Sequence, residues 1–280
     1  MKYTNKLNLP ESFAKFYKST EETIKENRYS VTELLKPTQE IILYRANINR
    51  IYRDIVDCVP ALFGTAVHEL LEKNAPEGAY SEHRLEFDIF GKTIVGVTDL
   101  LSEDMLEITD YKTGTTSKVM REDFDDFYKQ GMMYALGTFI KYGIKPRKLR
   151  FPILLKDWSK IKAATGGNYP NSPIYVWLWD IQQSDYDFIV DFIKKKFDEI
   201  DACKMHCTDE ERWYTGTRFA VYKKESDAKA KKIFDNKKDA DVYAEENSCE
   251  YVEERSGDYI KCDFYCDVRL FCDQYRKEKI

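Results

Sequence analysis

The stretch that most restricts the fold of this chain is SEHRLEFDIFGKTIVGVTDLL, residues 81–101. Apolar and polar residues alternate along two arms of it, and Phe90–Gly91–Lys92 separates the arms. Alternation with a period of two predicts strands with one buried face, and a short turn containing glycine predicts that the strands pair as a hairpin. A further apolar segment at residues 105–113, MLEITDYKT, predicts a third strand.

Helical patterns flank these three strands. Residues 61–75, ALFGTAVHELLEKNA, carry an apolar stripe at helical spacing, and residues 125–143, DDFYKQGMMYALGTFIKYG, end on a glycine with a proline just beyond. Residues 149–155, LRFPILL, predict a fourth strand. The order α-β-β-β-α-β over residues 60–156 therefore predicts an α/β fold with a mixed sheet.

Two less regular parts enclose this core. Residues 1–59 predict an N-terminal helical segment with a break at Pro37, and residues 60–157 form the core itself. Residues 158–280 predict an α+β C-terminal extension that ends in a cysteine-containing tail, KCDFYCDVRLFCDQY. We expect the extension to pack on the core, so that the chain forms one domain.

The composition argues against several classes of protein. Hydrophobic residues make up 43% and charged residues 33% of the 280 positions, which is typical of globular proteins and not of disordered ones. No apolar run approaches membrane-spanning length and the first residues lack an apolar signal core, so we expect a cytoplasmic protein without a membrane partner. The net charge of −5 argues against a protein that coats DNA and fits an enzyme whose carboxylates hold a cation.

An aspartate and a lysine share one side of the third strand. Asp110 and Lys112 are two positions apart, and residues i and i+2 of a strand face the same way. Asp99 ends the preceding strand, so pairing of the two strands would bring two carboxylates together. Neighbouring carboxylates repel each other, and a bound divalent cation removes that penalty. Hard oxygen ligands of this kind suit Mg²⁺ or Mn²⁺.

This grouping has a chemical use beyond an ion pair. A divalent cation neutralises a phosphodiester, acidifies a bound water and stabilises the leaving oxygen. A lysine beside the cation orients the water or offsets charge on phosphorus. The spacing thus favours metal-dependent phosphodiester hydrolysis with Asp99, Asp110 and Lys112 as catalytic residues. The alternative is an exposed ion pair, which is the commoner meaning of an acid and a lysine at this spacing.

Other side chains are candidates for the same site. His68 lies on the helix that precedes the strands, where it is either an additional metal ligand or a partly buried histidine without a ligand. Glu82, at the start of the first strand, is a weaker candidate. Gln130 and Tyr134 are four residues apart on the next helix and share a face, so they either hold Lys112 or a substrate phosphate, or pack at a helix interface.

Together these motifs resemble those of the RecB-like branch of the PD-(D/E)XK nuclease superfamily, with the second half of the chain resembling phage-encoded exonuclease relatives more loosely. The matching elements lie within residues 30–155, in family order. They are Gly64-x-x-x-His68, Glu82, Gly96-x-x-Asp99, Asp110-Tyr111-Lys112 and Gln130-x-x-x-Tyr134. Val97 and Thr98 replace the proline of the family name, which is a common variation. The resemblance implies a restriction-endonuclease-like core.

The resemblance also implies roles for the matched residues. A metal ion would be held by Asp99, Asp110, the carbonyl group of Tyr111 and His68. Lys112 would be the catalytic lysine. The metal would be Mg²⁺ or Mn²⁺, and the reaction would be the hydrolysis of phosphodiester bonds in DNA.

Gln130 and Tyr134 would form the supporting motif beside the substrate. The family acts most often as an exonuclease in recombination, repair or phage DNA processing. The resemblance therefore implies DNA as the substrate and a recombination or replication protein as a partner, and it leaves a homo-oligomer open. Two alternatives remain: a catalytically weak nuclease-fold module that binds DNA within a processing complex, and a structural protein built around a bound metal.

The cysteines raise the question of a second metal site. The chain has seven, four of them in the last 32 residues, which in a cytoplasmic protein suggests metal binding or buried thiols before disulfides. Several relatives hold an iron–sulfur cluster with one N-terminal and three C-terminal cysteines. The corresponding N-terminal step here is Lys36-Pro37, which argues against an intact cluster. The tail offers Cys262-x3-Cys266-x5-Cys272, and the alternatives are Cys58 as a fourth ligand, free thiols, or zinc held partly by Cys203, His206 or Cys207.

A basic run follows the second helix of the core. We expect phosphate contacts from it, because it begins close to the proposed site in the sequence. Its members are Lys141, Lys145, Arg147, Lys148 and Arg150. Among the aromatic residues of the second half, Trp177 and Trp179 either stack on unpaired bases or divide between core and surface.

Overall fold

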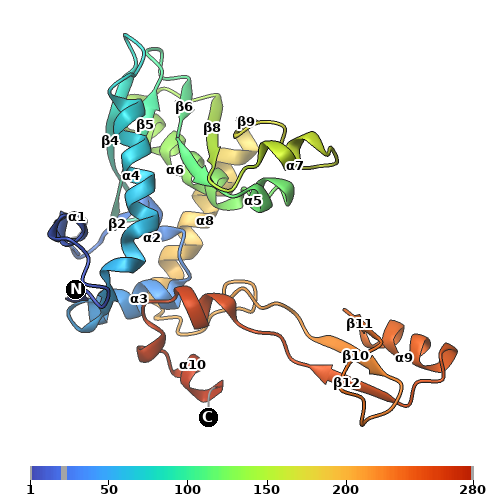
Figure 1. Cartoon of the computed structure of the whole chain (residues 1–280). Coiled ribbons are helices and arrows are strands. Elements are labelled where there is room, and N and C mark those ends of the chain that lie inside the picture. Colours follow the sequence, from blue (N-terminus) through green and yellow to red (C-terminus); the bar gives the residue numbers. More distant parts are fainter. Residues whose placement is uncertain (1, 20–23, 279–280) are drawn as a thin grey trace. The chain divides into compact units, whose positions relative to one another are not determined.

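A computed structural model describes residues 2–19 and 24–278 (Figure 1). The chain divides into two compact units, Met1–Lys204 and Met205–Ile280. We expected boundaries after residues 59 and 157, whereas the division lies at Lys204, because a strand and two helices beyond residue 157 belong to the first unit. Within the described ranges, no helix is long and apolar enough to cross a membrane.

A seven-stranded mixed sheet forms the centre of the first unit and confirms the expected α/β class. Its strands are β2 (Arg28–Ser30), β4 (Tyr80–Ile89), β5 (Lys92–Leu101), β6 (Glu107–Thr109), β7 (Lys112–Gly114), β8 (Lys148–Leu155) and β9 (Ile174–Asp180). β5 pairs with β2 in parallel and with β4 and β6 in antiparallel orientation. β8 pairs with β6 and β7 in parallel and with β9 in antiparallel orientation. The predicted third strand thus consists of two short pieces, β6 and β7, which share β8 as their neighbour.

The hairpin predicted from the alternating segment is confirmed. β4 and β5 pair along almost their whole length. Phe90 and Gly91 connect them with φ angles of 51° and 72°, and left-handed backbone at both positions is what a two-residue turn needs to match the twist of paired strands. Leu85, Phe87 and Ile94 are buried on the core side of the hairpin.

The helix α6 (Asp125–Tyr142) is the central helix of the first unit. It contacts β4, β5 and β6 on one side and the long helix α8 (Gln183–Asp201) on another. All positions from 130 to 138 are buried, as expected for a helix enclosed by other elements. It ends at Gly143, whose φ of 73° gives the left-handed cap predicted from the sequence.

The remaining helices of the first unit are shorter or lie at its edge. Ser30 caps α2, because its hydroxyl accepts the Glu33 N–H at 3.1 Å, and α3 begins just after Pro37. The N-terminal segment also contains a small parallel sheet of β1 (Lys2–Thr4) and β3 (Tyr52–Asp54), which the sequence did not predict. The helices are α1 (Glu11–Ser19), α2 (Val31–Leu34), α3 (Thr38–Asn47), α4 (Val59–Glu72), α5 (Thr116–Met120) and α7 (Lys160–Ala164).

The second unit has a small α+β core and a tail. Three antiparallel strands lie in the order β11-β10-β12, and α9 packs on them through Ala240 and Ala244. The tail forms short helical turns around its cysteines. The elements are β10 (Arg218–Tyr222), β11 (Lys232–Phe234), α9 (Lys237–Glu246), β12 (Tyr251–Arg255), the turns Lys261–Tyr265 and Arg269–Phe271, and α10 (Asp273–Glu278).

Close packing of α6 on the hairpin makes one glycine sensitive to substitution. A Cβ atom at Gly137 would lie 2.5 Å from Cε1 of Phe87, whose ring is only 4% exposed and has little room to move. We expect Gly137→Ala to lower the free energy of unfolding by about 1–3 kcal/mol, the usual cost of overpacking a core. Denaturant unfolding followed by circular dichroism measures the change.

Gly64→Ala is the matched control, because Gly64 is also in a helix but a Cβ atom there would have no neighbour within 4 Å. This variant should be neutral or more stable by up to about 1 kcal/mol, since alanine is the better helix former. Equal stability of the two variants would contradict the close contact between α6 and the hairpin.

Candidate active site

The end of β5 and the break between β6 and β7 bring the two aspartates together. β5 and β6 pair with Leu100 opposite Thr109, so Asp99 and Asp110 take neighbouring positions on adjoining strands. The sheet register continues through the break, because the Asp110 N–H donates to the Arg150 carbonyl at 3.0 Å. Asp99 is 8% and Asp110 2% exposed, so both residues are buried.

The hairpin is distorted beside Asp99. The ladder between β4 and β5 skips Asp99 and Glu82, which lies opposite it and has a φ of 47°. Left-handed backbone costs an L-residue about 1–2 kcal/mol and is concentrated at functional positions. Thr98 and Asp99 are both buried although neighbouring residues of a strand face opposite ways, so the sheet is covered on both faces at this point.

Both oxygens of Asp99 have protein partners. His68 Nδ1 on α4 lies 3.0 Å from Asp99 Oδ1, and the Tyr111 N–H donates to Asp99 Oδ2 at 2.6 Å. The Tyr111 N–H is free for this bond because β6 ends at Thr109 and β7 begins only at Lys112. The break in the predicted third strand therefore orients a carboxylate across the sheet.

Lys112 is held between Asp110 and α6. Its ammonium forms an ion pair with Asp110 Oδ2 and donates to Gln130 Oε1 at 2.8 Å. Gln130 Nε2 in turn donates to the Tyr134 hydroxyl at 2.8 Å. The Lys112 side chain is 16% exposed. Gln130 and Tyr134, expected to share a helix face, thus form a buried chain that ends on the lysine.

The surroundings shift the pKa values of these groups in different directions. Burial raises the pKa of Asp110, with a smaller contribution in the same direction from Asp99, while Lys112 opposes the shift. The hydrogen bond to Asp99 raises the pKa of His68, against the effect of burial. Burial and the charges of Glu72 and Asp99 raise the pKa of Glu82. Asp110 and Glu82 are therefore harder to ionise than free carboxyl groups, and His68 is easier to protonate than a free imidazole.

The chemistry of the donor set fits a hard divalent cation. Two buried carboxylates and a backbone carbonyl are oxygen donors of the kind that Mg²⁺ and Mn²⁺ prefer. Asp110 Oδ2 is buried and accepts no well-directed hydrogen bond among the described residues, although the Lys112 ammonium lies beside it. No three His, Cys, Asp or Glu side chains in that part of the chain are grouped as a metal site as they stand. Binding would require Lys112 and His68 to yield their contacts with the two carboxylates.

The structure thus brings the proposed metal ligands, Lys112, Gln130 and Tyr134 together, with Glu82 near Asp99, and it adds a residue that the sequence gave no reason to choose. Phe127, on the first turn of α6, lies with its ring 5.3 Å from Lys112 Nζ and 4.5 Å from Lys118 Nζ. A ring face next to an ammonium stabilises it by a cation–π interaction. In the sequence, Phe127 is one of many apolar residues at helical spacing and carries no separate signal.

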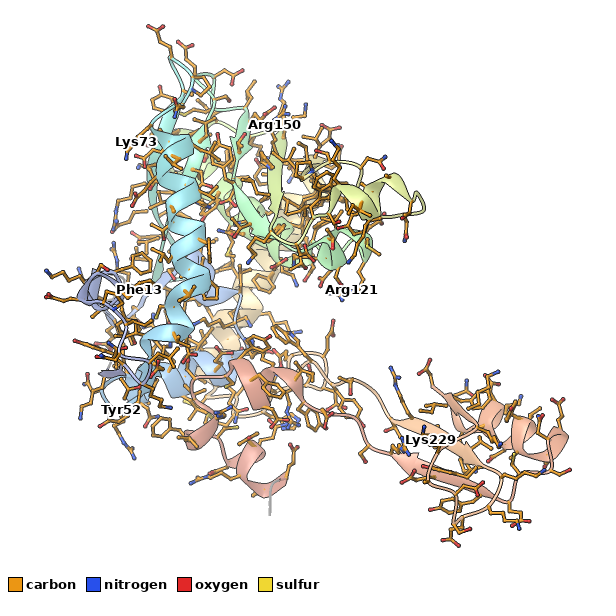
Figure 2. All side chains as sticks on the ribbon, in the orientation of Figure 1. Phe13, Tyr52, Lys73, Arg121, Arg150 and Lys229 are labelled. Carbon is orange, nitrogen blue, oxygen red and sulfur yellow. The ribbon has the colours of Figure 1, made fainter. Side chains whose placement is uncertain are left out.

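Several residues of the basic run that we expected to contact phosphate are paired with other protein groups. Arg150, labelled in Figure 2, and Lys148 both pair with Glu107, and Lys141 donates to the Arg84 carbonyl at 2.9 Å. Arg150 is opposite Thr109, one position out of phase with Asp110, so its side chain leaves the other face of the sheet. Strand alternation, which sequence distance does not reveal, therefore separates Lys148 and Arg150 from Asp110.

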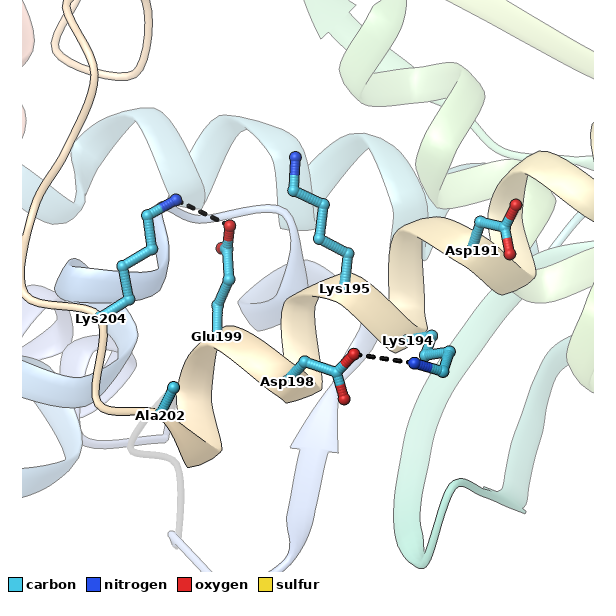
Figure 3. Close-up of a pocket in the computed structure, with 7 residues that line it drawn as sticks. All are labelled: Asp191, Lys194, Lys195, Asp198, Glu199, Ala202 and Lys204. Carbon is cyan, nitrogen blue, oxygen red and sulfur yellow. Dashed lines mark hydrogen bonds and ion pairs between the residues drawn. The ribbon is translucent and has the colours of Figure 1, made fainter.

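Two surface hollows lie outside this network. The first, drawn in Figure 3, is lined by α8 and the residues that follow it, and two of its three lysines pair with neighbouring acids: Lys194 with Asp198 at 2.9 Å and Lys204 with Glu199 at 2.7 Å. This is a solvated, mostly paired helix face. We therefore place the candidate site at the buried aspartates and not in this hollow.

The second hollow is aromatic. Trp179 Nε1 and the Tyr128 hydroxyl both donate to the buried Asp185, at 3.2 and 2.8 Å, while Trp177 packs on the core residue Phe151 with ring centroids 5.3 Å apart. The tryptophans thus divide between core and surface. The hollow is lined by Glu122, Phe124, Asp125, Tyr128, Tyr175, Trp177 and Trp179.

Comparisons with known proteins give no family assignment. No protein-family model matches the chain, and no curated protein matches its sequence. Among solved structures, SSO0001 is 15% identical, with 73% of this chain and 91% of that one covered at a TM-score of 0.49. An alkaline exonuclease from Laribacter hongkongensis is 12% identical (64% and 92% covered, TM-score 0.33), and a putative exonuclease from Eubacterium rectale is 12% identical (51% and 53%, TM-score 0.31). Structural similarity this weak does not identify the reaction, which has to be inferred from the side chains of the site.

The contact between His68 and Asp99 predicts an unusual titration. In metal-free protein, we expect the pKa of His68 to lie above the ordinary value of about 6.5 and that of His83 to lie below it, because burial lowers the pKa of His83. A raised pKa in the folded state means that this contact stabilises the fold fully below about pH 6.5 and that the contribution is lost as the pH rises through the folded pKa. Histidine ring signals followed by NMR against pH, in the presence of a chelator, measure both values.

His68→Gln assigns the signal and serves as the control. The difference in unfolding free energy between the wild type and this variant should shrink from pH 6 to pH 9. A His68 pKa at or below that of His83 would rule out the ion pair with Asp99.

Proposed function

We propose that this chain is a metal-dependent nuclease that hydrolyses phosphodiester bonds in DNA. The observation that carries the proposal is the meeting of two buried carboxylates, Asp99 and Asp110, with the ammonium of Lys112 on adjoining strands. A surface ion pair, the alternative weighed from the sequence, does not account for it, because Asp110 is only 2% exposed. Burying two carboxylates side by side costs free energy, and a bound cation would offset that cost.

The proposed metal ligands are Asp99, Asp110 and the Tyr111 carbonyl, with His68 as a further ligand. A bound Mg²⁺ or Mn²⁺ ion would neutralise the phosphate, lower the pKa of a water and stabilise the leaving oxygen. The Tyr111 N–H donates to Asp99 Oδ2, and this backbone contact would keep the carboxylate in one orientation when His68 yields its contact with Oδ1. Orientation of ligands by such neighbours is typical of functional metal sites.

Lys112 is the proposed catalytic lysine. Gln130 and Tyr134 hold its side chain from α6, and Phe127 covers one side of the ammonium. A preorganised cation in a nearly buried site can orient the attacking water and offset the charge that develops on phosphorus. Gln130 and Tyr134 contribute by positioning Lys112.

The finer assignment rests on the resemblance of the five motifs to RecB-like PD-(D/E)XK nucleases. It points to DNA as the substrate, to exonuclease activity, and to work in recombination, repair or phage DNA processing with a partner protein. Glu82 joins the motif set with an independent observation, its left-handed backbone beside Asp99. We include it as a residue that positions the distorted end of the hairpin.

One observation favours a second candidate, a nuclease-fold module that binds DNA without useful activity. Lys112 lies on Asp110 and His68 on Asp99, so the carboxylates are already balanced by protein groups. A site that keeps this pairing on meeting a metal would not be catalytic. Binding of Mn²⁺ to the wild type and to Asp110→Asn, measured by calorimetry, separates the two candidates.

The activity test uses end-labelled linear DNA. We expect label to be lost with Mg²⁺ or Mn²⁺ and not with a chelator, and Lys112→Ala to be slower by at least about 10²-fold, the usual cost of removing a charge-stabilising donor. Gln130→Ala should fall between this variant and the wild type, because it loosens the lysine without removing it.

Lys194→Ala is the matched control, because Lys194 also pairs with an aspartate, Asp198, but on an exposed helix face. It should cleave at the wild-type rate, and folding of each variant is checked by its unfolding curve. Cleavage that needs no divalent metal, or that survives in Lys112→Ala, would refute the proposal.

A further inference from the structure

Four of the seven cysteines belong to the second unit's tail and to the segment that leads into it. They are Cys207, Cys262, Cys266 and Cys272, here called the four-cysteine site. Cys207, Cys262 and Cys266 are partly buried and Cys272 is buried. They come from two segments that are far apart in sequence, one at Cys207 and one at residues 262–272, so only the folded tail can bring them together.

Gln274 clasps the Cys207 segment to α10. The Cys207 N–H donates to Gln274 Oε1 and Gln274 Nε2 donates to the Cys207 carbonyl, both at 2.9 Å. Gln274 is two residues beyond Cys272, so this two-way contact sets Cys207 beside the last cysteine of the tail. Because both hydrogen bonds of the Gln274 amide go to the backbone of Cys207, they fix the position of Cys207 relative to α10.

A second set of contacts joins Cys262 to the same place. Arg212 Nε donates to Cys262 Sγ at 3.4 Å, and the Lys261 N–H donates to the Arg212 carbonyl at 3.2 Å. From α10, the Tyr275 N–H donates to Cys272 Sγ at 3.4 Å. Two of the four sulfurs therefore already accept N–H donors, as thiolates in metal centres do.

The electrostatics agree with this geometry. Burial, with smaller contributions from Glu211, Cys272, Cys262 and Cys266 in that order, raises the pKa of Cys207 to about 12. Each of the other three sulfurs is thus close enough to Cys207 to affect its charge.

We propose that Cys207 is the fourth ligand of a thiolate-bound metal centre whose other ligands are Cys262, Cys266 and Cys272. The centre lies wholly within the second unit and needs no cysteine from the first, neither Cys58 nor a residue at Lys36–Pro37. It is independent of the nuclease proposal, because no residue of the candidate active site takes part.

Four thiolates are a donor set for a thiophilic metal, either as a zinc ion or as an iron–sulfur cluster. As they stand, no three His, Cys, Asp or Glu side chains of the described residues are grouped closely enough to hold an ion, so binding requires the sulfurs to move closer together. Arg212, 3% exposed and bonded to Cys262, supplies the buried positive charge that a negatively charged centre needs.

The remaining cysteines near this region provide controls. Cys203 is exposed, lies in the first unit, and is four residues before Cys207. A zinc site built on Cys203 and Cys207 would lose metal in either single variant, whereas the four-cysteine site loses it only in Cys207→Ser. Cys249 is also in the second unit, but its Sγ contacts the Asn247 carbonyl at 3.8 Å and it lies in neither of the two segments.

The test is metal analysis of the full chain purified without oxygen. We expect stoichiometric bound metal, either zinc or iron with acid-labile sulfide, near-complete loss in Cys207→Ser, and wild-type content in Cys203→Ser and Cys249→Ser. No bound iron or zinc in the wild type, or full retention in Cys207→Ser, would overturn the proposal.

Alkylation of the wild type covers the case in which Cys207→Ser does not fold. Iodoacetamide followed by mass spectrometry should modify Cys203 in native protein and spare the four-cysteine site. After chelation the four should react together. Reaction of Cys207 at the rate of Cys203 in metal-loaded protein would contradict the assignment.

Discussion

Two carboxylates buried side by side are the constraint on which the candidate site depends. Asp99 and Asp110 repel each other, and the surrounding structure answers that repulsion with directed contacts: His68 and the Tyr111 N–H on one acid and Lys112 on the other. These contacts need α4 and the interrupted strand β6–β7 in fixed positions. The left-handed backbone at Glu82 and the break between β6 and β7 are therefore part of the geometry of the site.

The central helix connects the site to the core. On α6, Tyr134 is hydrogen-bonded to Gln130, which is hydrogen-bonded to Lys112. The same helix packs against the hairpin at Gly137. A shift of α6 would therefore move both the lysine and the hairpin that carries Asp99. Rigid elements hold a catalytic group more closely than loops do, and here one buried helix serves both purposes.

Some of this was open to sequence reasoning because it depends on local rules. Period-two alternation located β4 and β5, the i, i+2 rule put Asp110 and Lys112 on one side, and the i, i+4 rule put Gln130 and Tyr134 on one face. Each rule holds whatever surrounds the segment. The same rules did not place the basic run, since the separation of Arg150 from Asp110 depends on strand pairing.

What the sequence determined, then, is the class of fold, the hairpin, and the identity of the residues that could form an acidic site, because periodicity and short spacings act along the chain. Only the tertiary structure decided that the hairpin is distorted beside Asp99, that Phe127 lies beside Lys112, and that Cys207 joins the cysteines of the tail. Those outcomes depend on contacts between residues far apart in the chain. Local pattern carries no information about such contacts, since they form only when separate elements pack against one another.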